Sequence, residues 1–138
     1  VMRVKMLIKL SLYRRGAGGV NEQTYEQQLD RMLAELSVSK RLFGYPMLRR
    51  AVLLVAERPA LIGAVTKELY PLVAAEFGMV PHQVEGAIRR ALVSAWEKGD
   101  TMVQKVYFDH TISAKRGRPT NAEFIADLAE RLRSGRVF

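Results

Sequence analysis

The chain has 138 residues, no cysteine and a formal net charge of +8, with a sequence pI near 10.1. This length suits one compact domain, the absence of thiols excludes disulfides and thiolate metal sites and favours a reducing cytoplasm, and no apolar run approaches the about 20 residues of a membrane span. The excess of Lys and Arg favours a polyanionic partner, either nucleic acid or an anionic membrane surface.

Residues 1–20 are predicted to form a short basic leader or linker arm, ahead of one helical domain over residues 21–138. Lys5 and Lys9 interrupt the apolar residues of the arm, so a secretion signal is not expected. A flexible break at Gly16–Gly19 then separates the arm from the domain. The apolar pattern of the arm leaves a short strand and an amphipathic helix both open.

Beyond the leader, the pattern predicts an all-α fold with no strand pair. Helical spacing of apolar residues, together with capping residues and prolines, places six helices. Their approximate ranges are 21–36, 46–57, 60–77, 81–98, 101–107 and 121–133. The last helix begins with a T-x-x-E capping box at Thr120 and Glu123. Within the third, Pro71 predicts a kink between Leu69 and Leu72.

The third and fourth of these helices have the pattern of a helix-turn-helix. Ala74 supplies a small residue where the two helices cross, Gly78 a glycine that is free to turn, and Val84 an apolar residue that seats the second helix. Pro81 stands at the first position of that second helix, where its missing N–H costs nothing. The helix over residues 81–98 would therefore be the DNA-reading helix.

This fourth helix divides into two faces at about 100° per residue. One face is an apolar stripe that predicts core packing, formed by Val84, Ile88, Ala91, Leu92, Ala95 and Trp96. The other face can meet a groove, and it carries His82, Glu85, Gly86, Arg89 and Val93, with Gln83 and Arg90 on its flank. His82, near the helix N-terminus, is a further candidate for DNA contact. Tyr70 and Trp96 could stack on bases, but their helical spacing favours core packing.

A second group of cations precedes the last predicted helix. Lys115, Arg116 and Arg118 lie in a loop just before a helix N-terminus, a pattern that favours contact with DNA phosphates. The alternative is a mobile basic loop that acts only through long-range attraction.

The sequence carries no pattern of a catalytic or metal site. His82 and His110 are the two histidines, and they lack the spacing of a zinc motif. No phosphate-binding glycine loop, nucleophile elbow or evident carboxylate pair occurs either. We therefore expect no metal, no other cofactor and no enzyme activity.

Several short phrases occur in a defined order along residues 22–133. They are Gly44-Tyr45 with Leu48-Arg49, AVTKELYP over 64–71, VEGAIRRA over 84–91, Ala95-Trp96, and PTNAEFIA over 119–126. In order and spacing they resemble the DNA-binding effector domain of the stage-zero sporulation transcription factor family, the response regulators that initiate sporulation. The resemblance implies a six-helix domain that binds a short DNA box through its fourth helix, as tandem copies or a dimer on DNA. It also implies contact with RNA polymerase and its sigma factor.

The resemblance further implies that the residues at positions 83, 85, 86 and 89 face the major groove. Glu85 and Arg89 match the family, whereas Gln83 and Gly86 stand where the family usually has arginines. Arg89 would donate to guanine and Glu85 would accept from cytosine, although the two can also form an i, i+4 ion pair. An arginine–guanine pair contributes about 1–3 kcal/mol of discrimination, so altered or weakened specificity is expected. Arg90 would add a phosphate contact, which positions the protein without reading sequence.

Family members carry a phosphoacceptor receiver domain ahead of the effector, and a 20-residue leader cannot contain one. The chain is therefore expected to be either a fragment or a stand-alone effector. The leading hypothesis is a sequence-specific transcription regulator in the bacterial cytoplasm, associated with the nucleoid. Two alternatives stay open: a protein-interaction module that pairs with a full-length regulator or sigma factor without reading DNA, and attachment to a membrane surface through the leader.

Overall fold

The computed structural model describes residues 24–108 and 117–135, and the predicted leader therefore lies outside the described residues. In chain order the described elements are α2 (Tyr25–Glu35), α3 (Tyr45–Glu57), the 3-10 helix η1 (Pro59–Ala64), the π-helical segment η2 (Val65–Leu69), α4 (Tyr70–Phe77), α5 (Pro81–Lys98), α6 (Thr101–Phe108) and α7 (Asn121–Ser134). No strand occurs within these ranges, and the prediction of an all-α fold with six helices is confirmed. None of the described helices is both long and apolar enough to cross a bilayer.

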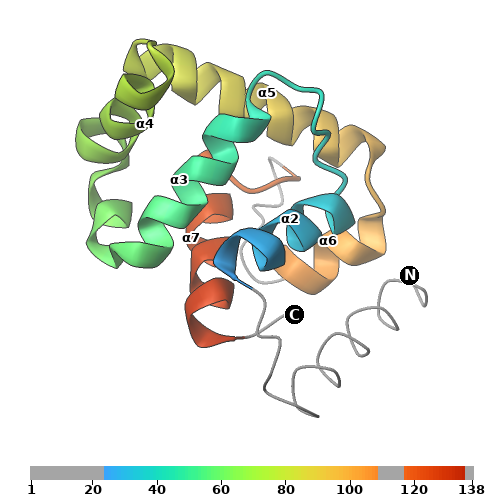
Figure 1. Ribbon diagram of the computed structural model, residues 1–138. Coiled ribbons are helices and arrows are strands. Elements are labelled where there is room, and N and C mark those ends of the chain that lie inside the picture. The colour runs from blue at the N-terminus through green and yellow to red at the C-terminus, as the bar shows by residue number, and fades with distance from the viewer. Residues whose placement is uncertain (1–23, 109–116, 136–138) are drawn as a thin grey trace.

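Helix α3 occupies the centre of the fold, and its sequence explains why. The apolar run Ala51–Ala56 covers the helix on all sides, and nine of its thirteen residues are buried. A helical segment that is apolar all round has to be buried all round. It packs most extensively against α7 and also contacts α2, α4 and α5 (Figure 1). The two helices of the predicted helix-turn-helix, α4 and α5, therefore both pack against the buried helix α3.

The N-terminus of α3 meets the backbone of α5 at Gly44. A Cβ atom added to Gly44 would lie 2.1 Å from the carbonyl oxygen of Ala87 and 2.5 Å from its carbonyl carbon. Only a glycine allows two backbones to approach this closely. Gly44 therefore sets the distance between the central helix and α5.

Reciprocal capping bonds begin α7 at the residue that the sequence predicts. The backbone N–H of Thr120 donates to Glu123 Oε1 at 2.8 Å, and the backbone N–H of Glu123 donates to Thr120 Oγ1 at 3.1 Å. This is the predicted capping box, and it satisfies two donors that the first helical turn leaves unpaired.

The predicted start of the first helix near Asn21 is wrong, because a capping box begins that helix later. Thr24 has extended dihedrals, φ −66° and ψ 165°, so α2 begins at Tyr25. The Thr24 Oγ1 accepts the backbone N–H of Gln27 at 3.2 Å, and Gln27 Oε1 accepts the backbone N–H of Thr24 at 3.1 Å. A glutamine can take the place of glutamate in this motif.

The helix predicted over residues 60–77 is three segments rather than one. Ala64 has the non-helical dihedrals φ −142° and ψ 47°, so the break in the helix lies between η1 and η2. The prediction placed the irregularity at Pro71 instead, but Leu69 and Tyr70 on its N-terminal side both have helical dihedrals. The π segment ends at Leu69, two positions before this proline, and provides a wider turn, which accommodates a residue without an N–H donor.

Aromatic packing closes the core between α5, α6 and α7. The ring of Trp96 meets Phe108 edge-on, with centroids 5.5 Å apart, and meets Phe124 in the same way at 6.0 Å. Tyr70 is also buried, with 6% of its surface exposed. Core packing was predicted for Trp96 and Tyr70, and the structure confirms it.

Candidate nucleic-acid interface

Helices α4 and α5 and the turn between them form the predicted helix-turn-helix. Gly78 has left-handed dihedrals, φ 65° and ψ 38°, which glycine adopts without steric cost. The carbonyl of Ala74 accepts the N–H of Gly78 and, at 2.9 Å, the N–H of Met79. Val80 is extended, and Pro81 begins α5. Gly78 therefore ends α4, and Pro81 begins α5, as the sequence predicts.

Helix α5 has one buried face and one face open to a partner. The buried face holds five of the six residues of the predicted apolar stripe, Val84, Ile88, Ala91, Leu92 and Ala95. The sixth, Trp96, is half-buried and packs against the core. On the opposite face His82, Gln83, Arg89 and Arg90 are exposed and Glu85 is half-buried. A partner that approaches this face meets polar and cationic side chains first.

A cleft of about 270 Å³ follows the exposed face, and we call it the α5 cleft. It is lined by the five residues predicted to read bases and by Arg90; the five are His82, Gln83, Glu85, Gly86 and Arg89. Phe43, from the loop between α2 and α3, and Met79, from the turn, line it as well. The structure thus adds two apolar side chains to the predicted polar set.

Several of the predicted base-reading side chains already have partners within the protein. The Oε1 atom of Gln83 accepts the backbone N–H of Val80 at 3.0 Å and so caps the start of α5. Arg89 Nε donates to Glu85 Oε2 at 3.1 Å, and these two side chains are 49% and 40% exposed. An exposed i, i+4 pair contributes only about 0.3–0.5 kcal/mol. Both side chains can therefore exchange this contact for others.

Gly86 lies on the open face of α5 but is buried by its neighbours. A Cβ atom added to Gly86 would lie 3.1 Å from Arg90 Nη1 and 3.6 Å from Arg89 Nη2. The guanidinium groups of these two arginines therefore cover the glycine backbone, and they fill the space that a side chain at this position would take.

We expect the substitution Gly86→Ala to increase the stability of the domain. Glycine in a helix interior is less favourable than alanine by about 0.5–1 kcal/mol. The closest atom to the added Cβ is the end of the exposed Arg90 side chain, which can move by a few tenths of an ångström. Urea unfolding should show a free energy of unfolding higher by up to about 1 kcal/mol. A lower value would show that the backbone around Gly86 does not tolerate a Cβ atom.

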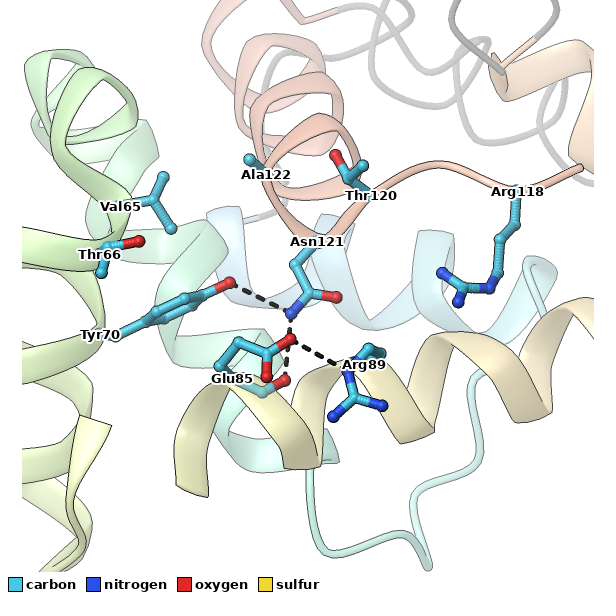
Figure 2. Close-up of a pocket in the computed structure, with 9 residues that line it drawn as sticks. All are labelled: Val65, Thr66, Tyr70, Glu85, Arg89, Arg118, Thr120, Asn121 and Ala122. Carbon is cyan, nitrogen blue, oxygen red and sulfur yellow. Dashed lines mark hydrogen bonds and ion pairs between the residues drawn. The ribbon is translucent and has the colours of Figure 1, made fainter. Parts of the chain in front are cut away.

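A second cleft, of about 400 Å³, lies between η2, α4, α5 and the start of α7, and we call it the α7 cleft. Figure 2 shows Arg118 extending from the segment before α7 toward α5, where Glu85 and Arg89 form the opposite wall. Arg89 lines both clefts and so forms the boundary between them. Arg118, which the sequence predicts to contact phosphate, lines this cleft beside α5. Lys115 and Arg116 lie outside the described residues.

Asn121, the first residue of α7, joins α7 to both helices of the helix-turn-helix. Its Nδ2 atom donates to Tyr70 Oη and to the backbone carbonyl of Glu85, each at 3.1 Å (Figure 2). Burial raises the pKa of Tyr70, the hydrogen bond from Asn121 lowers it, and the nearby Glu85 carboxylate raises it further. The net pKa is raised, so the neutral phenol acts as the acceptor.

Replacing Asn121 with alanine should destabilise the domain. The side chain is buried, and its loss removes the donor shared by Tyr70 and the Glu85 carbonyl. An unsatisfied buried polar group costs about 1–3 kcal/mol, so the free energy of unfolding should fall by a value in that range. Urea unfolding measures this change. A decrease below about 0.5 kcal/mol, the usual size for a surface change, would contradict the importance of these two bonds.

Sequence reasoning did not single out several residues that line these clefts, among them Phe43 and Asn121. Phe43 is 66% exposed, and it follows Lys40 and Arg41 in the same loop. An aromatic residue among cations is typical of nucleic-acid-binding surfaces and could have identified it. Asn121 occurred in one of the family phrases, but no local pattern indicated that its side chain would reach two other helices.

The packed helices, the left-handed turn and the open cationic face of α5 define a helix-turn-helix protein. A comparison with protein-family models matches residues 29–132, which are 104 of the 138 residues, to the family described as sporulation initiation factor Spo0A C terminal. The chain belongs to this Spo0A C-terminal family, as the resemblance in its sequence indicated. It is thus a DNA-binding transcription factor domain of the sporulation initiation type, and the family is not one of enzymes.

Proposed function

We propose that this domain is a sequence-specific transcription regulator that reads the major groove of double-stranded DNA with α5. The observation that carries the proposal is the α5 cleft, in which Glu85, Arg89 and their neighbours project from the N-terminal half of the open face of one helix. In helix-turn-helix proteins this part of the second helix contacts base edges. Arg89 would donate a bidentate pair to guanine O6 and N7, and Glu85 would accept from cytosine N4.

Phosphate contacts would hold α5 in register on the duplex. Arg118 lines the α7 cleft on one flank of α5, and Lys115 and Arg116 precede it in the chain. The net charge of +8 supports binding through counterion release. Such contacts give affinity and a steep dependence on salt, but they do not distinguish one sequence from another.

The family resemblance also supports a proposal about further partners of this regulator. We expect binding to tandem boxes or as a dimer on DNA, and contact with the sigma factor of RNA polymerase. The place of action would be the nucleoid in the bacterial cytoplasm. Residues 1–20 would act as a separate arm ahead of the helical domain over residues 21–138.

Selection of bound duplexes from random DNA tests the proposal. The full chain, held at one salt concentration, should enrich a short sequence motif that contains at least one G·C pair, as Arg89 and Glu85 require. Recovery of DNA without any enriched motif, while binding remains tight at low salt, would contradict sequence-specific reading.

A protein-interaction module is the second candidate. It is favoured by two α5 residues, Gln83 and Gly86, that are poorly suited to contact bases. The Oε1 atom of Gln83 is engaged in capping α5, and Gly86 has no side chain to offer a base. A module that pairs with a full-length regulator or sigma factor would not need these positions. Cross-linking and native mass measurements with those partners, combined with sequence-blind and steeply salt-dependent DNA binding, would support it.

A further inference from the structure

The side chain of Arg90 occupies the space above Gly86. Its Nη1 atom lies 3.1 Å, and its Cζ atom 3.8 Å, from the position that a Cβ of Gly86 would take. Helical side chains lean over the preceding turn, so a residue four positions later covers this spot when the spot itself is empty. The guanidinium group therefore lies over the N-terminal half of α5, one turn before its own Cα atom.

In the part of the chain that the structure describes, the guanidinium group of Arg90 is free to bind a partner that offers two hydrogen-bond acceptors. Arg90 is exposed and has no hydrogen-bond or ion-pair partner among residues 24–108 and 117–135. The Nη2 atom of Arg89 lies 3.6 Å from the same point above Gly86, while the carboxylate of Glu85 is engaged by Arg89 Nε. The Glu85 carboxylate therefore neutralises Arg89, and the neighbouring guanidinium group of Arg90 has no counter-charge of its own within these ranges.

The location of the Arg90 guanidinium group favours contact with a base over contact with a phosphate. Arg90 lines the α5 cleft together with His82, Gln83 and Arg89, and the N-terminal residues of a recognition helix face base edges. Arg118, by contrast, lies off the helix in the α7 cleft, where the flank of a bound duplex would bring a phosphate. A planar guanidinium presents two parallel donors, which match guanine O6 and N7.

We propose that Arg90 reads a guanine in the major groove, through the space that the missing side chain of Gly86 leaves open. This inference rests on the proposed DNA-reading function and makes Arg90 a specificity-determining residue rather than a phosphate contact. A side chain larger than hydrogen at position 86 would compete with the guanidinium for the same space.

The test compares Arg90→Lys with Arg118→Lys in the full chain, because lysine keeps the charge but loses the bidentate geometry. Dissociation constants are measured at one salt concentration for the selected duplex and for single base-pair variants of it. We expect Arg90→Lys to lower discrimination at one G·C position about fivefold or more. Arg118→Lys should leave discrimination at every position unchanged. Unchanged melting temperatures of both variants would show that the fold is intact.

Two other outcomes would overturn the inference and can be told apart. If Arg90→Lys retains full discrimination, and Arg90→Ala weakens binding to all duplexes equally while lowering the salt slope by about one, Arg90 contacts phosphate and the DNA-reading function still stands. If the wild-type chain itself shows no preference among duplexes, the proposed function fails, and the role of Arg90 fails with it.

Discussion

Replacing Arg89 with alanine should remove most of the preference of this domain for its selected DNA site over a scrambled duplex. The substitution deletes a bidentate pair to guanine worth about 1–3 kcal/mol, which corresponds to a loss of discrimination of about 5- to 150-fold. It also releases Glu85 from its partner, so that an uncompensated carboxylate faces the negatively charged DNA. The ratio of the two dissociation constants, measured at one salt concentration, reports the effect.

The variant Arg118→Ala is the matched control for Arg89→Ala, because both arginines line the α7 cleft. It should weaken binding to both duplexes by a similar factor and lower the salt slope by about one. Thermal unfolding of Arg89→Ala should change little, since the lost ion pair is exposed. An unchanged discrimination ratio in Arg89→Ala would show that Arg89 does not read a base.

The largest effect on stability is expected from Gly44→Ala. The added Cβ atom would lie 2.1 Å from the carbonyl oxygen of Ala87. The oxygen is a backbone atom and the backbone fixes the position of the Cβ atom, so no change of rotamer can separate them. The helices α3 and α5 would have to separate, which disrupts packing at the support of the recognition helix. Overpacking typically costs 1–3 kcal/mol and sometimes more, so we expect a decrease of about 3 kcal/mol in the free energy of unfolding. Urea unfolding measures this decrease.

Gly63→Ala provides the control for Gly44→Ala. A Cβ atom at Gly63 would meet no atom within 4 Å, so this substitution should leave the free energy of unfolding within about 0.5 kcal/mol of the wild type. Gly44→Ala should also lower DNA affinity, because it moves α3 away from α5, whereas Gly63→Ala should leave the affinity unchanged. Equal unfolding curves for the two variants would contradict the close approach of Gly44 to α5.

Features set by neighbouring residues could be predicted from the sequence. The capping box of Thr120 and Glu123, the left-handed turn at Gly78 and the proline at the start of α5 each depend on residues a few positions apart. The apolar stripe of α5 likewise follows from helical spacing alone. These local signals located the helix-turn-helix and identified the exposed face that carries Glu85 and Arg89.

Features set by contacts between distant segments could not be predicted in this way. Nothing local indicates that Gly44 must lie against the backbone of Ala87, or that Asn121 donates to groups on two other helices. The position of Arg90 over Gly86 depends on which rotamer an exposed side chain adopts, and helical spacing had placed Arg90 on the flank. The break at Ala64 between the 3-10 and π segments also had no local signal, because the apolar pattern over residues 60–77 is that of a single helix.

That α5 reads sequence is tested most directly by the ratio of two dissociation constants of the wild-type chain. One is for the selected duplex and the other for a scrambled duplex of the same length and composition, both measured over a range of salt concentrations. Specific helix-turn-helix binding predicts a ratio of about 10³ or more. This ratio should persist as both constants rise with salt, because phosphate contacts are common to the two duplexes. A ratio near one at every salt concentration would contradict base reading by α5.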